Sequence, residues 1–187
     1  MEKSVILIDA GNVLGGWFNY CTVNQLQAKI DYLKLVKKLS DGTNLLRPYF
    51  YDGVPENIPL KKKNFLEALQ HQGVQLRTKI LKDKRHTCTR CNHTDIKSVQ
   101  KGVDVSLATD ILRHSWQGSC ELCIVVSGDE DYSDAIKCVK DKGIKVWIAS
   151  FRSSLSNDLA MIADKVIYLD DIFDEIKQTP SQIPPQI

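Results

Sequence analysis

The sequence has little net charge and no long hydrophobic run. Its 25 Lys and Arg residues nearly balance its 23 Asp and Glu residues, which leaves a net charge of +2. So small a charge gives no chain-wide attraction for a polyanion, and any basic surface must be local. No apolar stretch approaches the roughly 20 residues that a membrane-spanning helix needs, so we expect no membrane partner.

An export signal is also lacking. The first apolar run lies within SVILID, residues 4–9. It is shorter than a secretory h-region, and no small-residue cleavage site follows it. We therefore expect a cytoplasmic protein, in which cysteines are reduced thiols or metal ligands rather than disulfides. The six cysteines are Cys21, Cys88, Cys91, Cys120, Cys123 and Cys138.

Internal repeats and linkers are absent as well, and 187 residues suit one domain with a single core. We expect this domain over 1–177, followed by a loose Pro-rich tail at 178–187. Apolar runs of strand length alternate with segments whose apolar residues recur at helical spacing. Strands are expected at 4–9, 45–52, 74–81, 122–127, 144–150 and 165–170, and helices at 25–39, 60–72, 103–116, 132–142 and 155–163.

Strands that alternate with helices are typical of parallel βαβ units with right-handed crossovers. The sequence therefore predicts a three-layer, Rossmann-like α/β fold with a mainly parallel sheet and helices on both faces. A polar excursion at 82–100, which has no hydrophobic periodicity, interrupts the alternation.

Acidic side chains follow two of the predicted strands. Asp9 ends the first strand, and Asp129 and Asp131 follow the strand at 122–127. Ligands of an open parallel sheet bind beyond the carboxyl ends of its strands, where Asp104 would also lie at a helix start. If the two strands are neighbours, Asp9 and Asp129 converge. Clustered carboxylates repel one another, and Mg²⁺ or Mn²⁺, which prefer oxygen ligands, would relieve the repulsion.

Helix capping is the alternative role for some of these carboxylates. Asp104 and Asp131 lie near expected helix starts, where a side-chain oxygen accepts backbone N–H bonds and interacts favourably with the helix dipole. Asp9 differs, because no helix is expected in the AGNVLGG that follows it. Asp110 lies about 120° around the helix from Asp104, so the two need not share a face.

Four segments, in this order, resemble the NYN family of the PIN-like nuclease superfamily. They are VILIDAGN, KGVDVSLATDIL, VVSGDEDYSDAI and SSLSNDLAMIADKVIYLD, and together they extend over roughly 4–170. The resemblance implies a PIN-like Rossmannoid sheet and a metal-dependent ribonuclease site. The residues that match the family's site are Asp9, Asn12, Asp104, Ser127, Asp129 and Asp131, with Asp110 at a second acidic position.

The resemblance also suggests roles. The carboxylates would hold Mg²⁺ or Mn²⁺, partly through waters because Mg²⁺ dehydrates reluctantly. Asn12 and Ser127 would hydrogen-bond a carboxylate, a metal-bound water or a phosphate oxygen. Lys101 would meet the scissile phosphate or be an ordinary solvated lysine. The aromatic side chains Trp17, Phe18 and Tyr20 are bulkier than expected after the first strand of this family, and would stack on bases or pack in the core.

A different kind of site is indicated by the segment RHTCTRCNH. A Cys-x₂-Cys turn places Cys88 and Cys91 for one zinc ion, and His86 and His93 would complete a tetrahedral structural Zn²⁺ site, unless one of them is replaced by a ligand from elsewhere. Free surface thiols and a redox pair are the alternatives.

Basic residues make the same segment positively charged. Lys84 and Arg85 would follow an RNA backbone or form a solvated face. The second Cys-x₂-Cys pair, Cys120 and Cys123, leads straight into the strand at 122–127, where reduced core cysteines are the plainer interpretation.

Together these features favour a Mg²⁺- or Mn²⁺-dependent endoribonuclease that cleaves phosphodiester bonds of single-stranded RNA. The main alternative is an RNA-binding or regulatory protein with a PIN-like fold and little turnover, which would not need the carboxylates. A Rossmann-like phosphatase is disfavoured, because Gly11 stands where a second Asp would be expected after Asp9. The sequence excludes neither DNA nor any oligomeric state.

Overall fold

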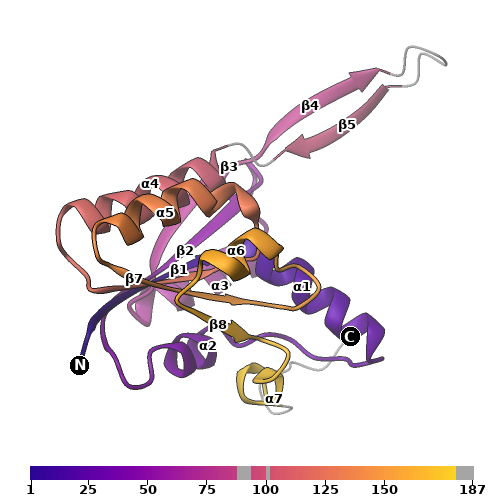
Figure 1. Cartoon of the computed structure of the whole chain (residues 1–187). Coiled ribbons are helices and arrows are strands. Elements are labelled where there is room, and N and C mark those ends of the chain that lie inside the picture. Colours follow the sequence, from indigo (N-terminus) through magenta and orange to yellow (C-terminus); the bar gives the residue numbers. More distant parts are fainter. Residues whose placement is uncertain (88–93, 100–101, 180–187) are drawn as a thin grey trace.

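The computed structural model describes residues 1–87, 94–99 and 102–179, with the backbone alone for 82–87 and 94–99. Six parallel strands form one sheet in the order β3-β2-β1-β6-β7-β8 (Figure 1). The strands are β1 (Lys3–Asp9), β2 (Asn44–Val54), β3 (Gln75–Ile80), β6 (Leu122–Val126), β7 (Lys145–Ser150) and β8 (Lys165–Tyr168). The chain winds outward from β1 in both directions, so the strand order reverses between β1 and β6.

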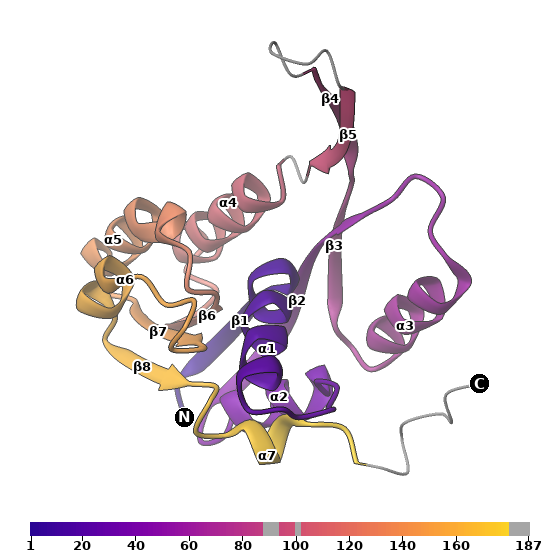
Figure 2. The ribbon, with the colours of Figure 1, turned by 90° about the vertical axis from the view of Figure 1, so that its right-hand side faces the viewer.

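Helices cover both faces of the sheet (Figure 2). One face carries α1 (Ala10–Val23), α2 (Tyr32–Leu39), α3 (Leu60–His71) and α7 (Phe173–Ile176), and the other carries α4 (Val103–Trp116), α5 (Ser133–Asp141) and α6 (Asn157–Ile162). Ile6 and Ile8 of β1 pack against the first group, and Val5 and Leu7 against the second, because successive strand residues point to opposite faces. The predicted three-layer α/β fold is confirmed. Among the described residues, no helix has the length and hydropathy needed to cross a membrane.

The expectation that no helix follows Asp9 is wrong. Helix α1 begins at the next residue, and Oδ1 of Asp9 caps it by accepting the backbone N–H of Asn12 at 3.1 Å. Glycines concealed this helix, because glycine is a poor helix former. Gly16 is nevertheless required by packing, since a Cβ there would come within 2.6 Å of Cδ2 of Phe151.

The helix expected over 25–39 is shorter than the periodicity predicted. Helix α2 begins directly after Asp31, whose Oδ1 accepts backbone N–H bonds from the first turn. Residues before this cap form no helix, and Ile30 instead makes an isolated antiparallel bridge to Lys177. Leu26, in the segment before this cap, is exposed, and so is Leu33 in the first turn of α2.

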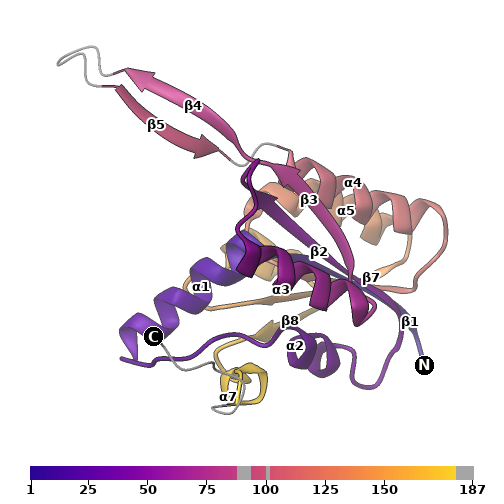
Figure 3. The same ribbon diagram turned by 180° about the vertical axis from the view of Figure 1, so that it is seen from behind.

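The polar excursion at 82–100 contains paired strands that the sequence did not predict. β4 (Lys82–Thr87) and β5 (Thr94–Val99) form an antiparallel hairpin that projects from the body beyond β3 (Figure 3). Cross-strand hydrogen bonds pair the facing backbone groups of the two strands. Such pairing does not require an apolar face, which explains why hydrophobic periodicity gave no signal. The tail expected at 178–187 lies outside the described residues from 180 onward.

Candidate active site

A group of carboxylates lies where the strand order reverses. β1 and β6 pair in parallel with Ile8 opposite Val126, so Asp9 and the residues after β6 emerge side by side from the sheet. Helix α4 begins at the same edge and carries Asp104 in its first turn. The condition for convergence of Asp9 and Asp129, that their strands be neighbours, is therefore met.

Asp9 is the most buried member of this group, at 4% exposure. While Oδ1 caps α1, Oδ2 accepts hydrogen bonds from Ser127 Oγ at 3.3 Å and from Tyr132 Oη at 3.0 Å. Capping and a place in the site are thus compatible in one carboxylate, because its two oxygens face different partners. Asp9 thereby joins the end of β1 to the turn after β6.

Asn12 reinforces the same connection from the first turn of α1. Its Oδ1 accepts the backbone N–H of Gly128 at 3.0 Å, and the N–H of Asp129 donates to Ser127 Oγ at 3.3 Å. Glycine is required in this turn, because a Cβ on Gly128 would collide with the carbonyl oxygen of Ser154. The S-G-D segment is therefore held against α1 by backbone and side-chain hydrogen bonds.

The acidic run after β6 forms a short 3₁₀ helix, η1 (Glu130–Tyr132). Asp129 caps it by accepting the backbone N–H of Asp131 at 3.1 Å. Asp129 is half-buried, whereas Glu130 and Asp131 are exposed at the rim. Of the acidic residues in this run, Asp129 is thus the least exposed, and it is the one whose charge acts on Asp9.

Tyr132 is a site residue that sequence reasoning missed. Its buried hydroxyl lies 3.0 Å from Oδ2 of Asp9 and 3.4 Å from Oδ1 of Asp104. Because both carboxylate oxygens contact the same hydroxyl oxygen, the distance between Asp104 Oδ1 and Asp9 Oδ2 cannot exceed the sum of these two distances. The only signal in the sequence was a tyrosine just after an acidic run, a position where an aromatic side chain usually indicates core packing.

The charges of these carboxylates act on one another. Burial raises the pKa of Asp9, and the charge of Asp129 adds to this, while hydrogen bonds from Asn12, Tyr132 and Ser127 oppose it. Burial and the charges of Asp9 and Asp129 likewise raise the pKa of Asp104. Burial also raises the pKa of Tyr132 far above its usual range, so its hydroxyl stays a proton donor.

Asp110, the second acidic position implied by the family resemblance, has partners that do not belong to the acidic site. Its Oδ2 accepts hydrogen bonds from Tyr51 Oη at 2.7 Å and Arg77 Nε at 3.1 Å, and its Oδ1 pairs with Arg113 at 3.0 Å. The carboxylate is only 6% exposed. Asp110 therefore ties α4 to β2 and β3, and its charge is already neutralised by two arginines.

The aromatic side chains after β1 divide between packing and exposure. The Trp17 ring stacks on Phe173 at 4.4 Å, and the Tyr20 ring lies 4.7 Å from that of Phe173. Both also contact Phe151. Phe18, in contrast, is 74% exposed. The geometry favours packing for Trp17 and Tyr20, and leaves Phe18 accessible.

Four of the predicted site residues, namely Cys88, Cys91, His93 and Lys101, lie outside the described residues. The backbone of Lys84, Arg85 and His86 belongs to β4. The hairpin is thus described as a pair of strands, and its zinc and RNA contacts stay predictions.

The second cysteine pair lies in the core. Cys120 and Cys123 are buried free thiols. Burial raises the pKa of Cys120 to about 11 and that of Cys123 well above its ordinary value. Both therefore stay protonated at neutral pH, which confirms the interpretation of reduced core cysteines.

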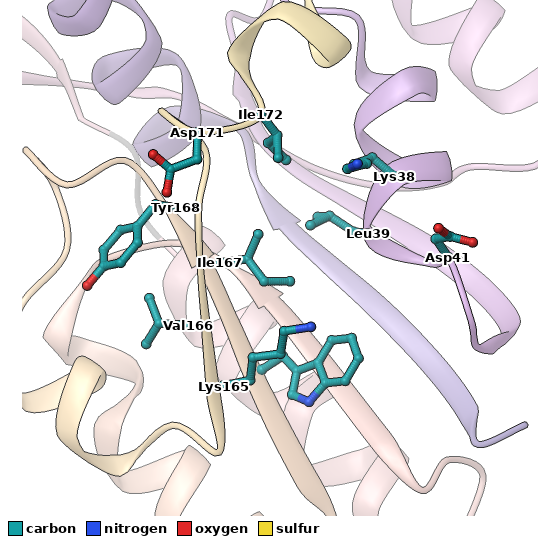
Figure 4. A pocket seen from close by; sticks show the side chains of 10 residues that line it. Lys38, Leu39, Asp41, Lys165, Val166, Ile167, Tyr168, Asp171 and Ile172 are labelled. Carbon is teal, nitrogen blue, oxygen red and sulfur yellow. The ribbon is translucent and has the colours of Figure 1, made fainter.

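A hollow of about 380 Å³ lies far from the carboxylates, between α2 and the edge strand β8 (Figure 4). Leu39, Trp147 and Ile167 contribute apolar walls, and the Lys165 ammonium lies 4.2 Å from the Trp147 ring centroid. Strand β8 is three strands away from β1 in the sheet. This hollow is therefore separate from the acidic site.

The donor chemistry of the acidic site suits a hard divalent cation. Asp9, Asp104 and Asp129 offer oxygen atoms only, and their mutual repulsion is of the kind that a cation relieves. Within the parts of the chain that the structure describes, however, no three His, Cys, Asp or Glu side chains form a ready coordination group. Waters would therefore have to complete the coordination sphere, as they commonly do for Mg²⁺.

The doubly wound sheet and the carboxylates at its switch point define a Rossmann-like α/β protein with an acidic site. The NYN domain model matches residues 3–170, and the chain belongs to the NYN family. The resemblance of its four segments to this family is thus confirmed. Membership indicates a PIN-like, nuclease-type or RNA-related function.

Known proteins are similar to the chain, in sequence or in fold. The low amplitude and bright protein LabA of Synechococcus elongatus is 24% identical over 135 residues, which cover 72% of this chain and 68% of LabA. The crystal structure of a protein of unknown function from Vibrio parahaemolyticus has a TM-score of 0.70 at 18% identity, and the match covers 95% of this chain and 96% of that one. At such identity the second likeness concerns the fold alone.

Proposed function

We propose that this protein is a Mg²⁺- or Mn²⁺-dependent endoribonuclease acting on single-stranded RNA. The observation that carries the proposal is the approach of Asp9 and Asp104 to one hydroxyl, with the charge of Asp129 acting on both. Among the described ion pairs, none gives these three carboxylates a Lys or Arg partner. Clustered, unpaired acids at a ligand-binding edge are costly for folding, which favours a functional reason for them.

The side chains have distinct roles in this proposal. Asp9, Asp104 and Asp129 hold the cation, and the exposed Asp131 reaches it through water. A bound cation supplies an acidified water and a counter-charge for the phosphodiester. Asn12 and Ser127 hold the turn after β6 against Asp9, so that the carboxylates keep their positions when RNA binds.

A cleavage assay tests the proposal. Labelled single-stranded RNA is incubated with Mg²⁺, Mn²⁺ or EDTA, beside the variant Asp129→Asn and the control Asp134→Asn. Asn keeps the shape of Asp129 but loses the charge that holds a cation, so cleavage should disappear. Asp134 is fully exposed on α5, with 98% side-chain exposure, so its variant should cleave normally. Undiminished cleavage by repurified Asp129→Asn would contradict the proposal.

An RNA-binding protein with little turnover is the second candidate. It is favoured by the lack of a three-ligand group among the described residues. In the same assay, RNA that binds but stays intact with every metal would support this candidate. Matched single-stranded DNA distinguishes a ribonuclease from a nuclease of broader specificity.

The hairpin is proposed to bind a structural Zn²⁺ through Cys88 and Cys91, with His86 and His93 as the remaining ligands. A metal would order a segment with little apolar surface, because binding free energy becomes folding free energy there. Elemental analysis of protein purified without chelator should find about one zinc per chain. Cys88→Ser should lose it, and a chain without zinc whose thiols are freely alkylated would refute the site.

A further inference from the structure

Two neighbouring hollows lie along the outer side of α1. One, of about 260 Å³, lies between α1 and α3, and its walls include Leu14. The other, of about 440 Å³, lies between the second half of α1 and the segment 25–28 that follows it. Trp17 and Ala28 line both hollows, and Trp17 Nε1 donates a hydrogen bond to the carbonyl oxygen of Ala28 at 3.1 Å. The two hollows together are called the α1 groove below.

Exposed apolar side chains line this groove. Phe18 is 74% exposed, and Leu14 and Leu26 are each 42% exposed. Single exposed apolar residues are normal, but a group of them beside a hollow is typical of an interaction surface. The residues that line the larger hollow are all uncharged. The α1 groove therefore suits a neutral, apolar partner rather than the phosphates of RNA.

The end of the described chain leads toward this groove. Helix α7 packs against α1 (Figure 2). Just after α7, Lys177 forms its antiparallel bridge with Ile30, and the backbone N–H of Gln178 donates to the carbonyl oxygen of Lys29 at 2.8 Å. Because this pairing is antiparallel, the chain after Gln178 is directed past Lys29 toward Ala28. Gln178 already lines the smaller hollow of the groove.

The sequence that follows has a composition that fits the groove. Residues 180–187, PSQIPPQI, carry no charged side chain and include three prolines and two isoleucines. Pro-rich segments favour the polyproline II conformation, which docks in aromatic-lined grooves with little loss of entropy. At about 3.1 Å per residue, Ile183 can reach roughly 15 Å from Gln178. Leu14 and Phe18 are only about 6 Å apart along α1, so both hollows are within this reach.

We propose that residues 180–187 pack along the α1 groove of their own chain. Their isoleucine and proline side chains cover Leu14, Phe18 and Leu26. A third hollow, between α2 and α3, also contacts Gln178, but the antiparallel pairing directs the chain away from it. The proposal does not depend on RNA cleavage, and it gives the expected tail a role in covering the helix that Asp9 caps.

Site-specific photo-cross-linking tests the proposal. A diazirine-bearing amino acid replaces Ile183 in the 187-residue chain, which is irradiated at low protein concentration and digested with trypsin. No Lys or Arg lies between Lys3 and Lys29, so residues 4–29 remain one peptide. This peptide should be cross-linked to the peptide 178–187, with the attachment points at 14–18 or 25–28. Irradiation in denaturing urea is the control and should remove these products.

Two matched variants show whether the groove itself holds the segment. Leu26 and Leu33 have similar exposures of 42% and 38%, but only Leu26 lines the α1 groove. Leu26→Asp places a charge in the apolar contact and should lower the cross-link yield about tenfold, equivalent to about 1.4 kcal/mol. Leu33→Asp introduces the same charge in the third hollow and should leave the yield unchanged.

Three results would overturn the proposal. Cross-links at Leu33, Ala68 or His71 would place the segment in the third hollow instead. Cross-linked dimers in place of single-chain products would show that the segment of a second copy occupies the groove. A yield equal to that in urea, or unaffected by Leu26→Asp, would show that residues 180–187 do not dock there.

Discussion

Tyr132 donates a hydrogen bond to Asp9 across 3.0 Å, from the 3₁₀ turn after β6 to the end of β1. The same hydroxyl lies 3.4 Å from Asp104. A hydrogen bond to a charged acceptor contributes about 1.5–3 kcal/mol, so one neutral donor offsets part of the repulsion between two carboxylates. The pKa of both acids is raised all the same, mainly because both are buried and, to a smaller extent, because neighbouring carboxylates repel them.

Replacing this donor should therefore destabilise the fold. Tyr132→Phe is expected to lower the free energy of unfolding by about 2 kcal/mol at neutral pH and to raise the pKa of Asp9 further. Urea denaturation measures the first effect, and NMR titration of the carboxyl carbon measures the second. Tyr168→Phe serves as the control. An unchanged pKa of Asp9 would show that the hydrogen bond does not form in solution.

Removing the charge of Asp9 should have the opposite effect on stability. Because its pKa is raised in the folded state, the wild-type protein loses stability as the pH rises from the unfolded value of about 3.9 through the folded value. Asp9→Asn keeps an oxygen that can cap α1 but cannot ionise, so it does not lose this stability as the pH rises. The variant should therefore be more stable than the wild-type protein at pH 7. Urea midpoints measured at several pH values should converge below about pH 4. A variant less stable at pH 7 would contradict this.

The fold could be predicted because the central strands are buried on both faces. Continuous apolar runs such as 4–9 and 122–127 are typical of such strands, and their alternation with helical segments left few topologies to consider. Helix α1 was missed because Gly11, Gly15 and Gly16 lower local helix propensity. Packing of the helix on Phe151 outweighs that propensity.

Only those parts of the acidic site that follow from the order of the strands could be predicted from the sequence. Asp9 and Asp129 follow neighbouring strands, so their approach follows from the order of elements. Tyr132 could not be assigned, because its role depends on which direction η1 takes after β6. Two partners of Asp110, Tyr51 and Arg77, come from β2 and β3, which no local spacing indicates.

Asp110 should be necessary for the fold rather than for the chemistry. Asp110→Asn leaves Arg77 and Arg113 without their shared anion and is expected to cost about 2–4 kcal/mol, less than for a fully buried pair because both arginines are partly exposed. RNA cleavage per folded molecule should be preserved. Asp104→Asn, on the same helix, should show the reverse pattern. Loss of cleavage by a folded Asp110→Asn protein would place this residue in the active site.

The β4–β5 hairpin should contribute to RNA binding through charge. Lys84 and Arg85 lie on β4, and β5 leads back toward α4 and Asp104. The double variant Lys84→Ala with Arg85→Ala should weaken RNA binding. Because single-stranded nucleic acid gives a slope of about −0.7 per phosphate neutralised, the slope of log affinity against log salt should become shallower by about 1.4. Lys37→Ala with Lys38→Ala, on the distant helix α2, removes the same charge and should leave the slope unchanged. Equal slopes for both double variants would show that the hairpin charges are ordinary solvated charges with no role in RNA binding.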